Sequence, residues 1–364
     1  MLFRSHDAVF QELTAGLNRP KAQWTPEWKT RELPPNLFAI ALPHYTSLLH
    51  LNQTLNLRAI TAARTGEVAK AHESALIIAR INQANFNEPC LIGLLVGVTG
   101  AKYLCNTTWE LCEAQSGTVE DFTRLESTIL SLDLHHAALR ASRSEMASAA
   151  NMLQYLKGAR ADMLALLTIN GEGTNNAGGN LLMRMTPSGF FDESGAVLVD
   201  REFRYLIKPL RDKGWMAMMQ SSQEWENELV EMNKSRWMHP TYIMTSLIAP
   251  ATKNIVSRCI YTQVLLDQAV IACALERHRI KHGSYPDSLD AVKLATGKPL
   301  PLDVMNGKPM GYRKTADGRY ALWAVGFGGE DGGGKRTLDE KHPENTKFSD
   351  TKYVGDWVWD FPAK

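Results

Sequence analysis

Histidine, serine and acidic side chains are common in this chain, but none stands in the spacing that a known catalytic motif requires. The patterns HExxH and GxSxG are both absent. His135 and His136 are adjacent, so on a helix they point about 100° apart and cannot chelate one ion from the same face. A further polar group sits near the end of a predicted helix, where a capped, solvated terminus accounts for it: Glu276, His278, His282 and Asp287. The sequence predicts no catalytic site.

A glycine- and asparagine-rich stretch offers the other conventional chemistry, phosphate binding. Residues 171–180 read GEGTNNAGGN and carry no lysine at the spacing of GxxxxGK[ST]. We therefore predict that this stretch is a connection and not a nucleotide site.

A long apolar helix is the element around which the C-terminal part is organised. Residues 264–275 are apolar on nearly every side, apart from Asp267 and Gln268. This pattern predicts a helix that is buried on most sides. Basic residues in its last turns, followed by Gly283, predict that it ends near His282.

Short elements follow this helix. Pro286 can occupy the first turn of a short helix that runs to about Val292, with Ser284 as its cap. Two candidate strands, residues 311–314 and 319–326, flank an Asp317-Gly318 pair, which is a strong hairpin signal. We expect a long helix followed by a small antiparallel sheet.

The order of these short motifs resembles a known family. The run of the apolar helix, ALERHRIKHGSYPDSLDAV, LPLDVMNGKPMGYR, the hairpin, AVG, a glycine-rich acidic loop and GDWVW looks like the globular domain of major (G-type) type II secretion pseudopilins. It is closer still to the pseudopilin-like modules at the end of large bacterial envelope proteins. The resemblance covers roughly the last hundred residues.

The resemblance also implies a metal site. In pseudopilins the loop after the last hairpin strand binds calcium, and the acidic positions that match best here are Asp331 and Asp356, with Glu330 and Asp350 as weaker candidates. Calcium takes six to eight oxygen ligands, so carboxylates mixed with carbonyls of a glycine-rich loop suit it. The chain departs from the family at Gly328, where many relatives carry Asp or Asn, and in a charged insert before the final strand. A solvated turn without an ion is the alternative.

The remaining sequence predicts a mainly helical N-terminal region, so the predicted class is α+β. We divide the chain into an irregular lead-in (1–35), a helical domain (36–160), a mixed connecting region (161–258) and the pseudopilin-like module (259–364). Stops at Gly66, residues 85–89, Gly117 and Asp133 predict about five helices in the helical domain. The helices form either a bundle or an array of helical hairpins. The array is an alternative because TGEVAKAHESALIIARI has the small-residue spacing of a tetratricopeptide-like unit.

Composition narrows the partners. With 40 basic and 39 acidic side chains the chain has a net charge of +1, which argues against nucleic-acid binding. Its five cysteines are too few and too irregularly spaced for a disulfide framework or a CxxC metal site. A single disulfide from Cys90 is the one exception left open.

The function expected from the resemblance is non-catalytic. It implies an extracytoplasmic envelope protein that binds protein partners in a secretion- or pilus-related assembly, with a membrane anchor ahead of the present Met1. The first thirty residues have no signal-peptide pattern, so a cytoplasmic protein is the alternative location. The alternative function is an extracytoplasmic ligand-binding protein or hydrolase with a cleft between the helical region and the module.

Overall fold

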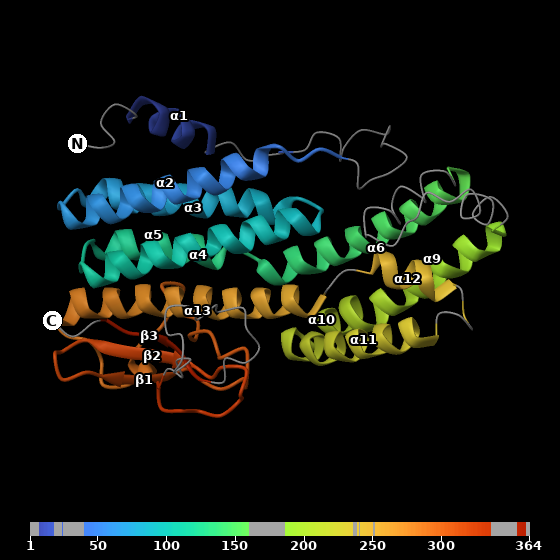
Figure 1. Ribbon diagram of the computed structural model, residues 1–364. Helices are drawn as coiled ribbons and strands as arrows, with labels where there is room; N and C mark the ends of the chain where they lie inside the picture. The colour runs from blue at the N-terminus through green and yellow to red at the C-terminus, as the bar shows by residue number, and fades with distance from the viewer. Residues whose placement is uncertain are drawn as a thin grey trace, which may run out of the picture.

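The computed structural model describes residues 7–17, 24, 40–159, 186–235, 239, 241–249, 252–335 and 355–361. It confirms the predicted α+β class, since helices dominate and the strands form one three-stranded antiparallel sheet. A single long helix, α13, separates a stack of helices from this sheet (Figure 1).

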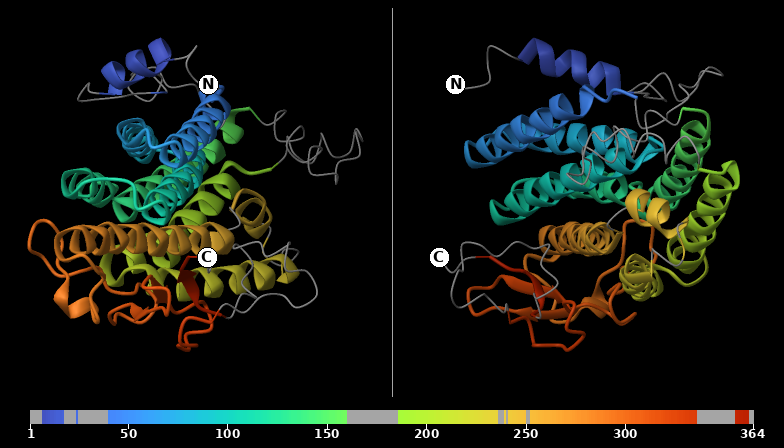
Figure 2. Two further views of the ribbon diagram at one scale, coloured as in Figure 1. Left: turned by 90° about the vertical axis from the view of Figure 1, so that its left-hand side faces the viewer. Right: turned by 45° about the vertical axis from the view of Figure 1, so that its right-hand side comes forward.

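The first part of the chain is a run of antiparallel helices. Their bounds are α1 Asp7–Leu17, α2 His44–Arg64, α3 Val68–Asn87, α4 Leu91–Glu113, α5 Val119–Leu130 and α6 Leu134–Gly158. The predicted stops are confirmed: Gly66 adopts a φ of 76°, and the Thr118 and Asp121 side chains form a reciprocal capping box at the start of α5. Stacked in layers, α2, α3 and α4 lie on the side of α13 opposite the sheet (Figure 2).

The irregular lead-in that we predicted is wrong for residues 7–17, which form α1. Phe10 is buried, and the guanidinium carbon of Arg58 lies 4.5 Å from the centroid of its ring. A tertiary contact therefore fixes a short helix that local propensity leaves marginal.

A second group of helices packs at the other end of the molecule. It comprises α9 Ser188–Glu202, a π-helical turn at Phe203–Ile207, α10 Lys208–Lys213, α11 Trp215–Ser235 and α12 Thr241–Ile248. With the C-terminal half of α6, these helices enclose a hydrophobic cluster of their own, which is built around Trp225 and Phe191. The stretch at 171–180, predicted to be a connection, lies outside the described residues.

Helix α13, Thr252–His282, is the central element. It ends where the sequence predicted, with Gly283 at a φ of 78°, and it packs against α4, α5 and α11. Residues 254–282 are long and apolar enough to cross a membrane, but 83% of the most apolar window is buried within the protein. A core helix gives the same pattern.

The sheet confirms the predicted hairpin. Strands β1 Gly311–Lys314 and β2 Tyr320–Ala324 pair antiparallel, Gly318 in the turn has a φ of 76°, and β3 Trp357–Trp359 adds to the other edge of β2. The short helix predicted from Pro286 to Val292 is wrong. Only a single 3-10 turn, Leu289–Ala291, forms there, and its cap is the Ser288 side chain.

One hydrophobic core joins the helical region to the C-terminal elements. Its buried members run from Phe10 in α1 to Trp359 in β3, and they are aliphatic, aromatic, methionine and cysteine side chains, which are the types most often buried. All five cysteines are free and buried. Cys90, for which a disulfide was left open, instead lies 3.1 Å from the hydroxyl of Tyr45.

The second cluster carries a buried acid with a measurable consequence. Glu202 is 1% exposed, and burial together with the nearby Glu145 carboxylate raises its pKa from 4.5 to about 8. Between pH 4.5 and 8 the folded protein keeps the Glu202 proton, whereas the unfolded chain has already lost it. The contribution of Glu202 to the free energy of unfolding therefore falls as the pH rises from about 4.5 to about 8, and it is level above that.

We expect Glu202→Gln, which is permanently neutral, to make this decline shallower and to be more stable than the wild type at pH 8.5 by about 2–4 kcal/mol. Urea unfolding at several pH values measures it. Glu193→Gln, an exposed position on the same helix, serves as the control and leaves the pH profile unchanged. A wild-type stability that is flat between pH 5 and 8 would contradict the account.

Candidate functional site

The predicted acidic loop lies beside the sheet and is held by its own carboxylates. Asp356 is 1% exposed, and its two oxygens accept hydrogen bonds from the backbone N–H groups of Gly332 (3.2 Å) and Gly334 (2.7 Å). Asp331 accepts from the Trp323 indole and from the Gly333 N–H, both at 2.8 Å. The two best-matching candidates therefore belong to one site, because both bind the same glycine run.

The other two sequence candidates are not placed in this site. Glu330 is exposed beside Asp331, with no hydrogen bond to the glycine run. Asp350 lies outside the described residues.

The structure adds an acid that we did not select from the sequence. Asp303 is 2% exposed, and it accepts from the N–H groups of Met305 (2.9 Å) and Val325 (2.8 Å). Burial raises its pKa, and the charges of Asp356 and Asp331 raise it further. The sequence signal that could have pointed to Asp303 is the turn motif DVMNG, in which the Asp side chain accepts a hydrogen bond from the backbone two residues later.

The donor set suits a hard cation. Two carboxylates, Asp331 and Asp356, contact the glycine-rich backbone, and calcium binds carboxylate and backbone carbonyl oxygens together. Among the described residues no three His, Cys, Asp or Glu side chains are grouped closely enough to hold a metal by themselves. A calcium ion here would use Asp331 and Asp356 with carbonyls of the loop, and it would tie that loop to β3.

A buried ion pair fixes the C-terminal elements to the helical stack. Glu126 on α5 is 1% exposed and accepts from Arg277 of α13 at 2.6 Å. Its other oxygen accepts from the backbone N–H of Ala295 at 2.6 Å, and Arg277 donates to the Lys293 carbonyl at 2.9 Å. One carboxylate thus joins α5, α13 and the segment that leads to the sheet.

Two more residues make polar contacts across the same boundary. Arg319, at the start of the second hairpin arm, donates to the carbonyls of Cys112 (3.0 Å) and Glu113 (2.6 Å) in the last turn of α4. The Trp109 indole donates to the Asp360 carbonyl at 2.9 Å. Within the module, Gln268 of α13 donates to the Trp357 carbonyl of β3 at 2.7 Å. The hydrogen bonds of Arg319 and Trp109 therefore fix the position of the module relative to the helices.

We predicted that the polar residues near the end of α13 form a solvated helix end, and this prediction is wrong for Glu276. This carboxylate is 0% exposed, accepts from the Tyr285 hydroxyl at 2.5 Å and pairs with Arg279 at 2.8 Å. Burial raises its pKa, whereas the hydrogen bond from Tyr285 opposes that rise. Tyr285 returns to the helix because Gly283 turns the chain, so Glu276 is a structural acceptor. The rings of His278 and His282 have their centroids 4.3 Å apart and are tilted by 34° to each other.

Comparison with protein-family models, with characterised proteins and with solved structures gives no match, so a function for this chain rests on the geometry of its own residues.

Proposed function

We propose that this protein is a non-catalytic scaffold of the bacterial cell envelope, in which a pseudopilin-like module is held rigidly on a helical stack to bind protein partners. The resemblance of the last hundred residues supports the envelope location and the class of partner. Protein contacts in a secretion- or pilus-related assembly would be its activity.

The contact of Glu126 with Arg277 and Ala295 is the observation that carries this proposal. A buried ion pair contributes little net stability compared with an apolar substitute, but it penalises every arrangement in which its charges separate. Together with Arg319 it holds the module in one orientation, which suits a part that presents a fixed surface.

The burial of α13 also supports a role other than polymerisation. Pseudopilins assemble through an exposed hydrophobic stem, whereas here α13 is covered by α4, α5 and α11 on one side and contacts β2 on the other. We therefore expect no filament. Electron microscopy of the purified protein tests this, and ordered fibres would contradict it.

Location is tested by fusing the native gene, with its natural start, to alkaline phosphatase, which is active only outside the cytoplasm. We expect an active fusion. A fusion that is inactive as phosphatase, while the same gene fused to a cytoplasmic reporter is active, would overturn the envelope assignment and leave the cytoplasmic alternative.

Calcium at the glycine loop is a separate expectation. A ligand that binds only the folded state raises the melting temperature as its concentration increases, so calcium should raise it and magnesium at the same concentration should not. Asp331→Asn should abolish the rise, because it removes one of the two carboxylates that would bind calcium. Asp331 is exposed, so its replacement leaves the hydrogen bonds of the buried Asp356 intact.

Asp287→Asn is the matched control, since Asp287 is an exposed carboxylate of the module with its side chain 94% accessible. It should keep the full response to calcium. Equal responses in Asp331→Asn and the wild type would remove the calcium site.

A further inference from the structure

A cavity of about 730 Å³ lies within the helical region, between α1, α3 and α5. This volume falls in the range of small-molecule sites. It is remote from the acidic loop, because none of its lining residues belongs to α13 or the sheet. The side chains that the following argument uses are Lys70, Glu73, Ile77, Arg80, Asp121 and Arg124.

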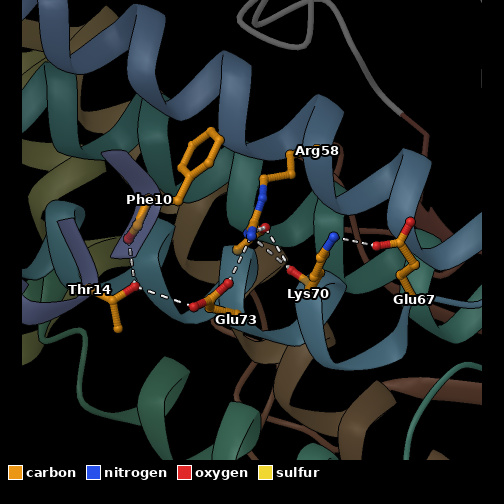
Figure 3. A network of polar contacts seen from close by, with 7 residues as sticks. Phe10, Thr14, Arg58, Glu67, Lys70 and Glu73 are labelled. Atoms are coloured by element: carbon orange, nitrogen blue, oxygen red, sulfur yellow. Dashed lines mark hydrogen bonds and ion pairs between the residues drawn. The ribbon is translucent and has the colours of Figure 1, made fainter. Parts of the chain in front are cut away.

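Helix α1 closes one side of this cavity and is held there by a polar network. Arg58 of α2 donates to Glu73 at 2.9 Å and to Ser74 at 2.7 Å, under the ring of Phe10 (Figure 3). Thr14 of α1 lies 3.4 Å from the other oxygen of Glu73. Since Arg58 is 5% exposed, α1 is anchored by a buried charge.

The two acidic side chains of the cavity both have hydrogen-bond partners within the protein. Glu73 is paired with Arg58, as Figure 3 shows. Asp121 accepts from the N–H and the hydroxyl of Thr118 in the capping box, where the amino end of α5 favours its charge. Glu73 therefore has its counter-ion within the protein, whereas Asp121 keeps its negative charge and is held by neutral donors.

The basic side chains are not balanced in the same way. Lys70 pairs with Glu67 outside the cavity at 2.6 Å, but Arg80 of α3 donates only to the neutral amide of Gln83 at 2.7 Å. Arg124 of α5 has no partner for its guanidinium among the described residues. Two arginines on facing helices, Arg80 and Arg124, therefore bring two positive charges to one cavity, against one carboxylate without an ion pair among the described residues, that of Asp121. Guanidinium groups bind carboxylate or phosphate through two parallel hydrogen bonds.

The rest of the lining suits the body of an organic molecule. Leu76 and the buried Ile77 supply apolar surface, and hydroxyls of Ser127, Thr128 and Ser131 line the α5 side. Beneath them His72 is 4% exposed and bonds through Nε2 to the Ser116 carbonyl at 2.9 Å. Burial lowers the pKa of His72, so its imidazole is neutral at neutral pH and adds no positive charge to the cavity.

We propose that this cavity binds a small organic oxyanion, with its phosphate or carboxylate on Arg80 and Arg124 and its apolar part on Leu76 and Ile77. This goes beyond the scaffold function and does not depend on it. A ligand site in the helical region would also differ from the cleft between the helical region and the module.

The test is isothermal titration calorimetry of the full chain with phenyl phosphate, benzoate and inorganic phosphate at millimolar concentrations. We expect saturable binding of at least one aromatic oxyanion, tighter than inorganic phosphate because of the apolar wall. Arg124→Gln and Arg80→Gln should each weaken it about tenfold or more, the size of one charge-assisted contact.

Arg143→Gln is the matched control, because Arg143 is an exposed arginine of α6 outside the cavity, and it should bind as the wild type does. Circular dichroism confirms that each variant is folded. No saturable binding of any probe, or equal loss in Arg143→Gln, would overturn the proposal. Binding only to vesicles that contain phosphatidic acid, with none to the free probes, would also overturn it in favour of a lipid surface.

Discussion

Glu126→Ala should lower the free energy of unfolding by about 3–5 kcal/mol, the cost of removing one partner from a buried ion pair. The substitution leaves the guanidinium of Arg277 and the N–H of Ala295 without their acceptor in a site where Glu126 is 1% exposed.

Urea unfolding followed by far-UV circular dichroism measures this loss. Glu231→Ala is the control, because the Glu231–Lys234 pair has both side chains largely exposed and such pairs contribute about 0–1 kcal/mol. The double variant Glu126→Ala/Arg277→Met should lose less than the sum of the single losses, by at least about 1 kcal/mol. Additive losses would mean that the two residues do not act as a pair.

Trp225→Ala should cost a similar amount, about 3–5 kcal/mol, because it empties the centre of the second hydrophobic cluster. Trp225 is 0% exposed and stacks on Tyr205 with ring centroids 5.8 Å apart. Its neighbours come from α6, α9 and α12, so no single helix can move to fill the space.

Phe203→Ala is the matched control in the same group of helices, since Phe203 is 40% exposed and its removal should cost about 1 kcal/mol or less. The same urea experiment compares the two variants. A Trp225→Ala protein as stable as Phe203→Ala would show that this cluster does not contribute to global stability.

The elements predicted correctly are those specified by local patterns. The end of α13 follows from basic last turns and Gly283, the hairpin follows from Asp317-Gly318, and the start of α5 follows the stop at Gly117. Each of these signals involves residues within a few positions of one another, so the sequence displays them directly.

The features that escaped prediction depend on residues distant in sequence. The Glu126 partners lie 151 and 169 positions away, and nothing in the pattern of α5 marks this acid as buried. Helix α1 is held by the contact of Phe10 with Arg58. In place of the helix predicted after Pro286, only the 3-10 turn Leu289–Ala291 forms. The carboxylates of Asp331 and Asp356 were selected by resemblance, whereas Asp303 needed the folded backbone to join them.

Hydrogen exchange of the native protein, followed by mass spectrometry, tests most directly whether the module and the helical stack are one unit. We expect amides of α5, α13 and β2 to open with the same free energy, and Glu126→Ala to lower all three together. If β2 and α13 keep their protection in that variant while α5 alone loses it, the module folds independently of the helices and the rigid scaffold is wrong.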